Sequence, residues 1–98
     1  MEKFTQAESE KALTTIEDWK RVEGREALSR KFIFKDFQDA FAWMTKMAMV
    51  AEKMDHHPEW LNIWNSVDVT LSTHDAQGIT QKDIDLAQAM DIAFKPYC

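Results

Sequence analysis

The sequence predicts an α+β fold, in which a four-stranded antiparallel sheet has three helices packed on one face. Two observations predict it. Paired segments with alternating apolar residues are separated by tight turns, as in hairpins, and three segments carry apolar residues at steps of three and four, as in helices. Hairpins or one long helix join the strands, which favours an antiparallel over a parallel sheet. Because 98 residues suffice for one core, we expect residues 1–98 to form a single domain.

The first helix is predicted from a start signal and a modest apolar face. Thr5 and Glu8 have the spacing of a capping box, in which each side chain bonds the other residue's backbone N–H. Apolar residues follow at helical spacing, namely Ala7, Ala12, Leu13 and Ile16. This helix should end near Glu17.

A hairpin is predicted next. Residues 19–22 and 27–34 have the composition of strands and flank a turn at residues 23–26 that contains Gly24. Along the second strand, Arg30 interrupts a row of apolar residues that point the same way, Leu28, Phe32 and Phe34.

The second helix is predicted over residues 37–54, with Asp36 as its cap. It carries two apolar rows: one contains Phe37, Phe41, Met44, Ala48 and Ala51, and the other contains Trp43, Met47, Val50 and Met54. A small core needs only one such row. The second row therefore indicates either a deeply buried helix or a helix shared with another subunit.

Another hairpin and a last helix complete the chain. Residues 61–64 and 67–73 predict strands joined tightly at 65–66. In the second strand Val67, Val69 and Leu71 face one way, whereas Asp68, Thr70, Ser72 and His74 face the other. Gly78 breaks the pattern, and the capping-box spacing of Thr80 and Asp83 predicts a helix over residues 81–94.

Composition and charge exclude several classes of protein. With 45% hydrophobic and 30% charged residues, the chain resembles an ordinary globular protein, and no apolar stretch is long enough to cross a bilayer. The formal net charge of −5 argues against direct binding of nucleic acid through phosphates. No secretory signal is recognisable at the N-terminus, so the cytoplasm is the expected compartment. The one cysteine, Cys98, is expected to be an unreactive terminal thiol.

All three histidines lie between residues 56 and 74, so every side chain that ordinarily titrates near neutral pH is in one part of the chain. His56 and His57 are adjacent, and Pro58 favours an extended backbone that makes their side chains diverge, which disfavours a shared metal ion. One interpretation is that the histidines have no role. The other is that the loop of Asp55, His56, His57 and Trp60 and the strand end with His74 converge on one cleft.

Such a cleft would be suited to proton transfer. Several imidazoles with carboxylates nearby, and no nucleophilic serine or cysteine, favour acid–base over covalent catalysis. Addition or elimination of water is a reaction of this kind, because one proton is delivered to a hydroxyl and another is removed from a neighbouring atom. Glu52, Asp55 and Asp83 are candidates for orienting the imidazoles, although each is equally consistent with an ordinary surface or capping carboxylate.

The segment from Glu52 to Trp60, with Asn62 and the segment from Val67 to His74, closely resembles the signature of the pterin-4a-carbinolamine dehydratases. Upstream residues 23–27 and 32–37 and downstream Gly78, Asp83 and Ile84 extend the resemblance over nearly the whole chain beyond the first helix. The resemblance implies a four-stranded sheet with three helices on one face. It also implies loss of water from 4a-hydroxytetrahydropterin to give quinonoid dihydropterin, the recycling step for aromatic amino acid hydroxylases, with no metal or organic cofactor.

The resemblance also assigns roles to individual residues. His56 and His74 are the expected acid–base pair, and His57 is expected to bind and position the pterin within the catalytic group. The expected substrate-binding residues are Asp55, His56, His57, Pro58, Trp60, Ser72, Thr73, His74 and Asp75. Pro58 and Trp60 would be walls of the site, although Trp60 is equally consistent with the core. Glu52 and Asp83 are the expected supporting carboxylates.

The sequence departs from the animal members at Asp75 and Ala76, where these tend to carry glutamate and cysteine, so no role of that cysteine transfers. Animal members also act as dimerisation partners of a homeodomain transcription factor through a helical surface. The row of Trp43, Met47, Val50 and Met54 is a candidate for that surface and is equally compatible with a homo-oligomer, a dimer or tetramer. Three interpretations therefore remain: a dehydratase, a helix-mediated interaction module, and a histidine–metal protein.

Overall fold

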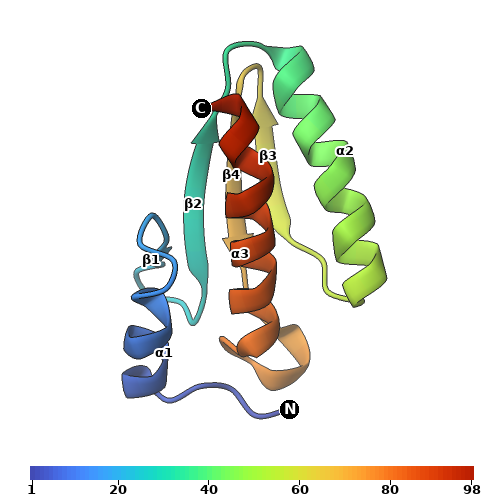
Figure 1. Cartoon of the computed structure of the whole chain (residues 1–98). Helices are drawn as coiled ribbons and strands as arrows, with labels where there is room; N and C mark the ends of the chain where they lie inside the picture. Colours follow the sequence, from blue (N-terminus) through green and yellow to red (C-terminus); the bar gives the residue numbers. More distant parts are fainter.

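The computed structural model describes residues 1–98 and confirms the predicted fold class (Figure 1). Four antiparallel strands are arranged in the order β1-β2-β4-β3, and α2 and α3 lie side by side over one face of the sheet while α1 lies near β1. No helix has both the length and the apolar character needed to cross a membrane. In chain order the elements are α1 Gln6–Leu13, β1 Lys20–Arg21, β2 Leu28–Ile33, α2 Phe37–Met54, β3 Glu59–Ile63, β4 Ser66–Leu71, the 3₁₀ turn η1 His74–Ala76, α3 Gln81–Phe94 and η2 Lys95–Tyr97.

The first helix has the predicted capping box but ends at Leu13 rather than near Glu17. The hydroxyl groups of Thr14 and Thr15 donate to the carbonyls of Lys11 and Ala12. Backbone N–H groups in this stretch also bond three residues back, so the chain tightens into turns. Side-chain hydroxyls that compete for backbone carbonyls in this way shorten helices.

The interruption of the apolar row on β2 by Arg30 has a structural reason. Arg30 shares the covered face of the sheet with Phe32, and its guanidinium lies 4.4 Å from the centre of that ring and 5.2 Å from that of Phe94. Its Nη1 donates to Asp91 Oδ1 at 2.6 Å. The charge is therefore paired at the border of the core, where an unpaired charge would be costly.

The strand register brings three strand ends to one end of the sheet. Leu28, the first residue of β2, pairs with Leu71, the last residue of β4, and Glu59, the first residue of β3, pairs with Thr70. The hairpin turn between β3 and β4 is Trp64–Asn65, one residue earlier than predicted, and Trp64 has a left-handed backbone with φ 49°. The chain that leaves β4 and the chain that enters β3 thus lie beside each other.

The core lies between the sheet and helices α2 and α3. It contains sixteen buried residues, including Val67, Val69 and Leu71 of β4 on the predicted inward face and Leu86 and Met90 of α3. The boundaries of α2 and α3 agree with the prediction to the residue.

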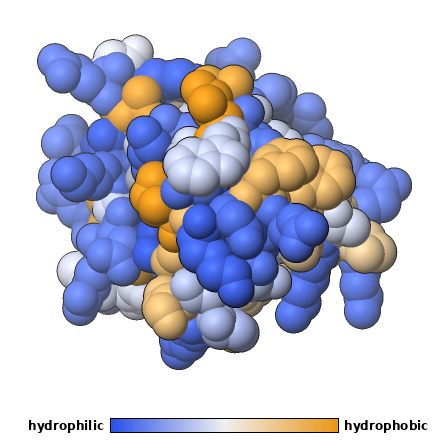
Figure 2. All heavy atoms as spheres, turned by 90° about the horizontal axis from the view of Figure 1, so that it is seen from above, coloured by the Kyte–Doolittle hydropathy of each residue, from blue (hydrophilic) through white to orange (hydrophobic).

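The orientation of α2 decides between the two alternatives for its second apolar row, burial within the subunit or a contact with another subunit. Trp43 and Met47 are each only 1% exposed and belong to the core of the subunit, so they cannot form the contact surface proposed from the sequence. Instead, Phe37 and Phe41 of the other row are 45% and 54% exposed. Figure 2 views the end of the molecule where α2 begins, and apolar side chains are visible there among hydrophilic ones.

Candidate active site

A polar cavity of about 200 Å³ lies at the end of the sheet where β4 ends and β3 begins. Three segments line it: the chain after α2, the chain after β4, and the first turn of α3. None of its lining residues is hydrophobic; they are Asp55, His56, His57, Ser72, Thr73, His74, Asp75 and Lys82. All three histidines of the chain therefore reach the same cavity.

The end of α2 directs the first two histidines away from the helix. Asp55 adopts the left-handed conformation with φ 53°, which aspartate tolerates better than most residues. Its N–H donates to the Glu52 carbonyl at 3.2 Å, and the N–H of His56 donates to the Ala51 carbonyl at 3.0 Å. These bonds satisfy carbonyls at the helix end, and the chain then continues in a new direction toward β3.

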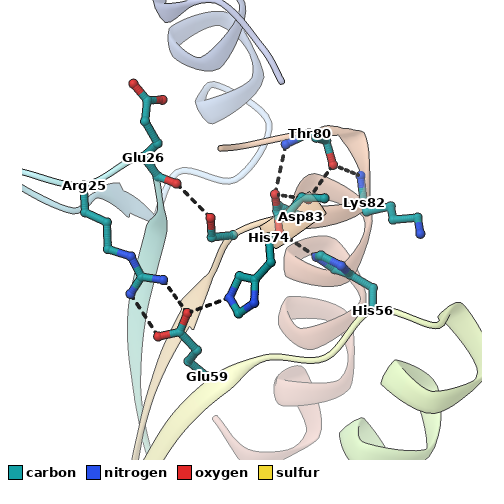
Figure 3. A network of polar contacts seen from close by, with 10 residues as sticks. Arg25, Glu26, His56, Glu59, His74, Thr80, Lys82 and Asp83 are labelled. Atoms are coloured by element: carbon teal, nitrogen blue, oxygen red, sulfur yellow. Dashed lines mark hydrogen bonds and ion pairs between the residues drawn. The ribbon is translucent and has the colours of Figure 1, made fainter. Parts of the chain in front are cut away.

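His56 is held by a buried carboxylate. Its Nε2 lies 2.6 Å from Oδ1 of Asp83, a residue with no exposed surface. The other carboxylate oxygen of Asp83 accepts from the Thr80 N–H at 2.9 Å and from the Thr73 hydroxyl at 2.8 Å. Asp83 is thus both the capping-box residue of α3 and the partner of His56 (Figure 3). The start of a helix therefore fixes the position of the imidazole.

His57 has a partner of a different kind. Its Nε2 lies 2.7 Å from Oε1 of Glu52 in the last turn of α2, and both side chains are mostly exposed to solvent. An exposed pair of this kind contributes little to folding. It can still orient the ring at the mouth of the cavity.

His74 has the weakest direct support. Its Nε2 lies 3.4 Å from Oε2 of Glu59, the first residue of β3. Two nitrogens of the Arg25 guanidinium donate to the two oxygens of the same carboxylate (Figure 3). The hydrogen bond from Arg25 lowers the pKa of Glu59 to about 2; partial burial opposes the shift, and the hydrogen bond of His74 adds to it.

The three histidines share one pattern: in each of them Nε2 faces a carboxylate. An ionised carboxylate only accepts hydrogen bonds, so Nε2 must carry a proton in each pair. Nδ1 is then the nitrogen that is left to give or take a proton, because the partner of the other nitrogen decides the tautomer. No group of three or more His, Cys, Asp or Glu residues in the chain is arranged to hold a metal ion.

Comparison with known proteins identifies the family. The sequence model of the family described as pterin 4 alpha carbinolamine dehydratase matches residues 2–93. The chain belongs to this family. A relative in Rhodopseudomonas palustris (strain HaA2), provisionally named pterin-4-alpha-carbinolamine dehydratase, is 54% identical over 91 residues, which are 93% of this chain and 90% of the relative. One in Bradyrhizobium diazoefficiens with the same provisional name is 53% identical over 94 residues, 96% of this chain and 94% of the relative.

A solved structure agrees with this assignment to the dehydratase family. The crystal structure described as a transcriptional coactivator/pterin dehydratase from Brucella melitensis has a TM-score of 0.91 and 48% sequence identity, and the match covers 93% of this chain and 97% of that one. The resemblance read from the histidine, proline and tryptophan segment and from the strand end with His74 is therefore confirmed at the level of the family.

Most of the residues expected from the dehydratase signature line the cavity, but four do not. Glu52 and Asp83 stand behind His57 and His56 as their hydrogen-bond partners. Trp60 is half-buried, with its ring centre 6.4 Å from that of Trp43, and it packs toward the core. Neither Pro58 nor Trp60 belongs to the lining of the cavity, so their role as walls of the pterin site stays a prediction.

The sequence did not indicate a role for three residues near the dehydratase cavity. Lys82 lines the cavity from the first turn of α3. Its position two residues after the cap Thr80 could have indicated that it lies near the same helix start as Asp83. Glu59 and Arg25 support His74 without lining the cavity. They belong to segments of the family resemblance, but their contact depends on the strand register, which the sequence does not reveal.

Proposed function

We propose that the chain removes water from a 4a-hydroxytetrahydropterin to give the quinonoid dihydropterin, with histidines as acid and base. One observation carries the proposal: three histidines, each with Nε2 against a carboxylate, reach one polar cavity in a chain that belongs to the pterin 4 alpha carbinolamine dehydratase family. The elimination is redox-neutral, so the proposal requires only proton donors and acceptors. Its product would be returned to the tetrahydropterin used by aromatic amino acid hydroxylases.

In the proposed mechanism His56 and His74 serve as the acid–base pair. One imidazole delivers a proton to the 4a-hydroxyl, whose oxygen leaves as water when the C4a–O bond breaks. The other removes the proton from N5, and the electron pair of that N–H bond forms the new C4a–N5 double bond. Imidazole as a chemical group suits both tasks near neutral pH, since its reference pKa is about 6.5.

The remaining cavity residues would bind the pterin. His57, which also lines the cavity, is proposed to position the heterocycle rather than exchange a proton in the rate-determining step, which is the role that the family resemblance implies for it. The Asp55 and Asp75 carboxylates and the Ser72 and Thr73 hydroxyls offer hydrogen-bond partners to the flat, polar ring system. Correct placement of the substrate between the two acid–base histidines contributes to the rate in its own right.

The test is the rate of dehydration of a 4a-hydroxytetrahydropterin that an aromatic amino acid hydroxylase generates in the assay. Wild-type protein is expected to accelerate the reaction over the spontaneous rate. His56→Ala and His74→Ala should each lower kcat on the order of 10²-fold, the usual contribution of one general acid or base. His57→Ala should mainly raise KM. A folded wild-type protein that gives no acceleration would contradict the proposal.

We also propose that the chain forms a homo-oligomer through the exposed side chains of Phe37 and Phe41 on α2. The Phe37 and Phe41 rings lie with their centres 5.5 Å apart and are about half exposed, so they form an adjoining apolar pair on the surface of the subunit. Sedimentation should show an oligomer for wild-type protein and a monomer for Phe41→Glu, whereas Lys46→Glu, on another side of α2, should leave assembly unchanged. A monomeric wild-type protein would contradict the proposed homo-oligomer. The surface would then be left to a different protein partner. The Brucella melitensis protein is described as a transcriptional coactivator, a role that requires such a partner.

A further inference from the structure

The turn between β1 and β2, residues 22–27, contacts the site from across the sheet. It lies at the same end of the sheet as the cavity, because the start of β2 pairs with the end of β4. Arg25 in this turn reaches Glu59 in β3, 34 positions later in the sequence. Since β4 separates β2 from β3 in the sheet, the arginine spans two strand spacings of roughly 4.8 Å each.

The contact of Arg25 with Glu59 fixes the carboxylate in two ways. The guanidinium donates through Nη1 to Oε1 at 2.9 Å and through Nη2 to Oε2. A two-pronged contact of this type sets the plane of the carboxylate as well as its position. It also holds the pKa of Glu59 at about 2, so the carboxylate, which is ionised at neutral pH in any case, stays ionised further into the acid range.

His74 depends on this carboxylate because nothing else in the chain holds its ring. The side chain is 77% exposed, and the contact of Nε2 with Glu59 at 3.4 Å is the only hydrogen bond that the ring makes. This bond is long, as is common for catalytic contacts without substrate. If Glu59 were free to change its rotamer, neither the direction nor the tautomer of the imidazole would be defined.

The same turn also supports the segment that carries His74. Ser72 lies two residues before His74, and its hydroxyl donates to the backbone carbonyl of Glu26 at 3.0 Å. Gly24 allows the turn to form, because its φ of +77° lies in the region that side chains disfavour. The turn therefore supports one side of the cavity through two independent contacts. The Arg25 side chain binds Glu59, and the Glu26 backbone carbonyl accepts from Ser72.

We propose that Arg25 is a positioning residue for the dehydratase reaction, acting through Glu59 to hold the His74 ring with Nε2 protonated and Nδ1 toward the substrate. Arg25 itself touches no substrate. This inference rests on the proposed function, in which His74 exchanges a proton with the pterin. The turn between β1 and β2 is accordingly a part of the catalytic apparatus rather than only a connection between strands.

The first test is kinetic and uses a matched arginine as its control. Arg25→Ala should lower kcat roughly tenfold, the loss expected for one hydrogen bond to a charged group, with KM changed less than about twofold because the binding residues are untouched. Arg25→Lys should recover part of the loss. Arg21→Ala removes the neighbouring exposed pair with Glu26 and should behave as wild type. Unchanged kcat in Arg25→Ala would overturn the proposal.

A double variant separates positioning from an indirect effect on folding. If Arg25 acts through His74, Arg25→Ala combined with His74→Ala should be no slower than His74→Ala alone, because the second change removes a contact already lost. Losses that multiply would show that Arg25 acts by another route and would overturn the proposal.

A third measurement is independent of activity. In ¹⁵N spectra at neutral pH, the His74 ring of wild-type protein should show the tautomer protonated at Nε2, and Arg25→Ala should show a mixture of both tautomers. Carbon-13 titration should find the Glu59 pKa near 2 in wild-type protein and closer to its ordinary value in Arg25→Ala. Unaltered His74 and Glu59 signals in the variant would overturn the positioning role. The signals could change as expected while wild-type protein shows no dehydratase activity. In that case the proposed function would be wrong, but Arg25 would still be shown to hold His74 through Glu59.

Discussion

Two histidine–carboxylate pairs belong to the candidate site, and they are built in opposite ways. His56 and Asp83 are almost completely buried, with exposed side-chain fractions of 8% and 0%, and their contact is 2.6 Å long. His74 and Glu59 are exposed to 77% and 43%, and their contact is 3.4 Å long. The same chemical pairing is therefore achieved once within the protein interior and once in solvent.

The two pairs differ because their carboxylates are held by different means. Asp83 is fixed by the Thr80 N–H as part of the α3 capping box, and by the Thr73 hydroxyl from the chain that follows β4. Glu59 is fixed by a cation from a distant turn. A buried carboxylate with several donors is costly to remove because the donors would lose their partners, whereas an exposed pair is close to neutral for folding. The buried pair should thus couple catalysis to stability, and the exposed pair should affect catalysis with little effect on stability.

The largest effect is expected from Asp83→Ala. The change leaves the Thr80 N–H, the Thr73 hydroxyl and His56 Nε2 without their buried acceptor, so the free energy of unfolding should fall by about 3–5 kcal/mol. Urea denaturation measures this. The control is Asp85→Ala on the exposed side of the same helix, which should change stability by less than about 0.5 kcal/mol. Equal stability of the two variants would show that the cap network does not couple the site to the fold.

A smaller change, Asp83→Asn, should separate the tautomer from the fold. The amide oxygen can still accept from the Thr80 N–H and the Thr73 hydroxyl, but its NH₂ group would then face His56 Nε2. That nitrogen would have to accept, so the ring proton would move to Nδ1. We expect kcat to fall on the order of 10²-fold, with a smaller loss of stability than in Asp83→Ala. The ¹⁵N spectra of Asp83→Asn should show the reversed ring tautomer of His56. If kcat nevertheless equals that of wild type, His56 is not a member of the acid–base pair.

Local signals in the sequence predicted much of the fold. Asp36 and the box formed by Thr80 and Asp83 mark the starts of α2 and α3, and both helices have the predicted limits. The early end of α1 was not predicted, because the hydroxyls of Thr14 and Thr15 decide it. The direction in which α2 faces was not predicted either. Both rows of this helix are apolar, and only the packing of the sheet against Trp43 determines which row is buried.

In the site, too, the sequence predicted the residues that belong to local motifs but not the contacts between distant segments. The motif segments contain the three histidines, and the structure brings them to one cavity. The suggestion that Asp83 orients an imidazole came from residue type and position, and the structure identifies His56 as its partner. Nothing local pointed to Arg25 as the support of Glu59. That contact exists because the strand order brings a turn and an edge strand to the same end of the sheet, and a single sequence does not contain the register.

The smallest effect on stability is expected at the exposed pair and should depend on pH and salt. The pKa of Glu59 is lowered to about 2 from its ordinary value of 4.5. A carboxylate with a lowered pKa in the folded state contributes stability above its unfolded pKa and loses it as the pH falls to the folded pKa. Because the side chain is largely exposed, the contribution should be under about 1 kcal/mol at neutral pH and should decrease with salt.

Glu59→Gln measures this contribution. The difference in unfolding free energy between wild type and variant should be small at pH 7, decrease below about pH 4.5 and vanish near pH 2, while kcat at pH 7 falls roughly tenfold because the glutamine no longer supplies a charged acceptor to His74. Glu23→Gln, in the same turn as Arg25, should change neither quantity. A stability loss in Glu59→Gln as large as that in Asp83→Ala would erase the distinction between the two pairs, since the exposed carboxylate would then be as much a part of the fold as the buried one.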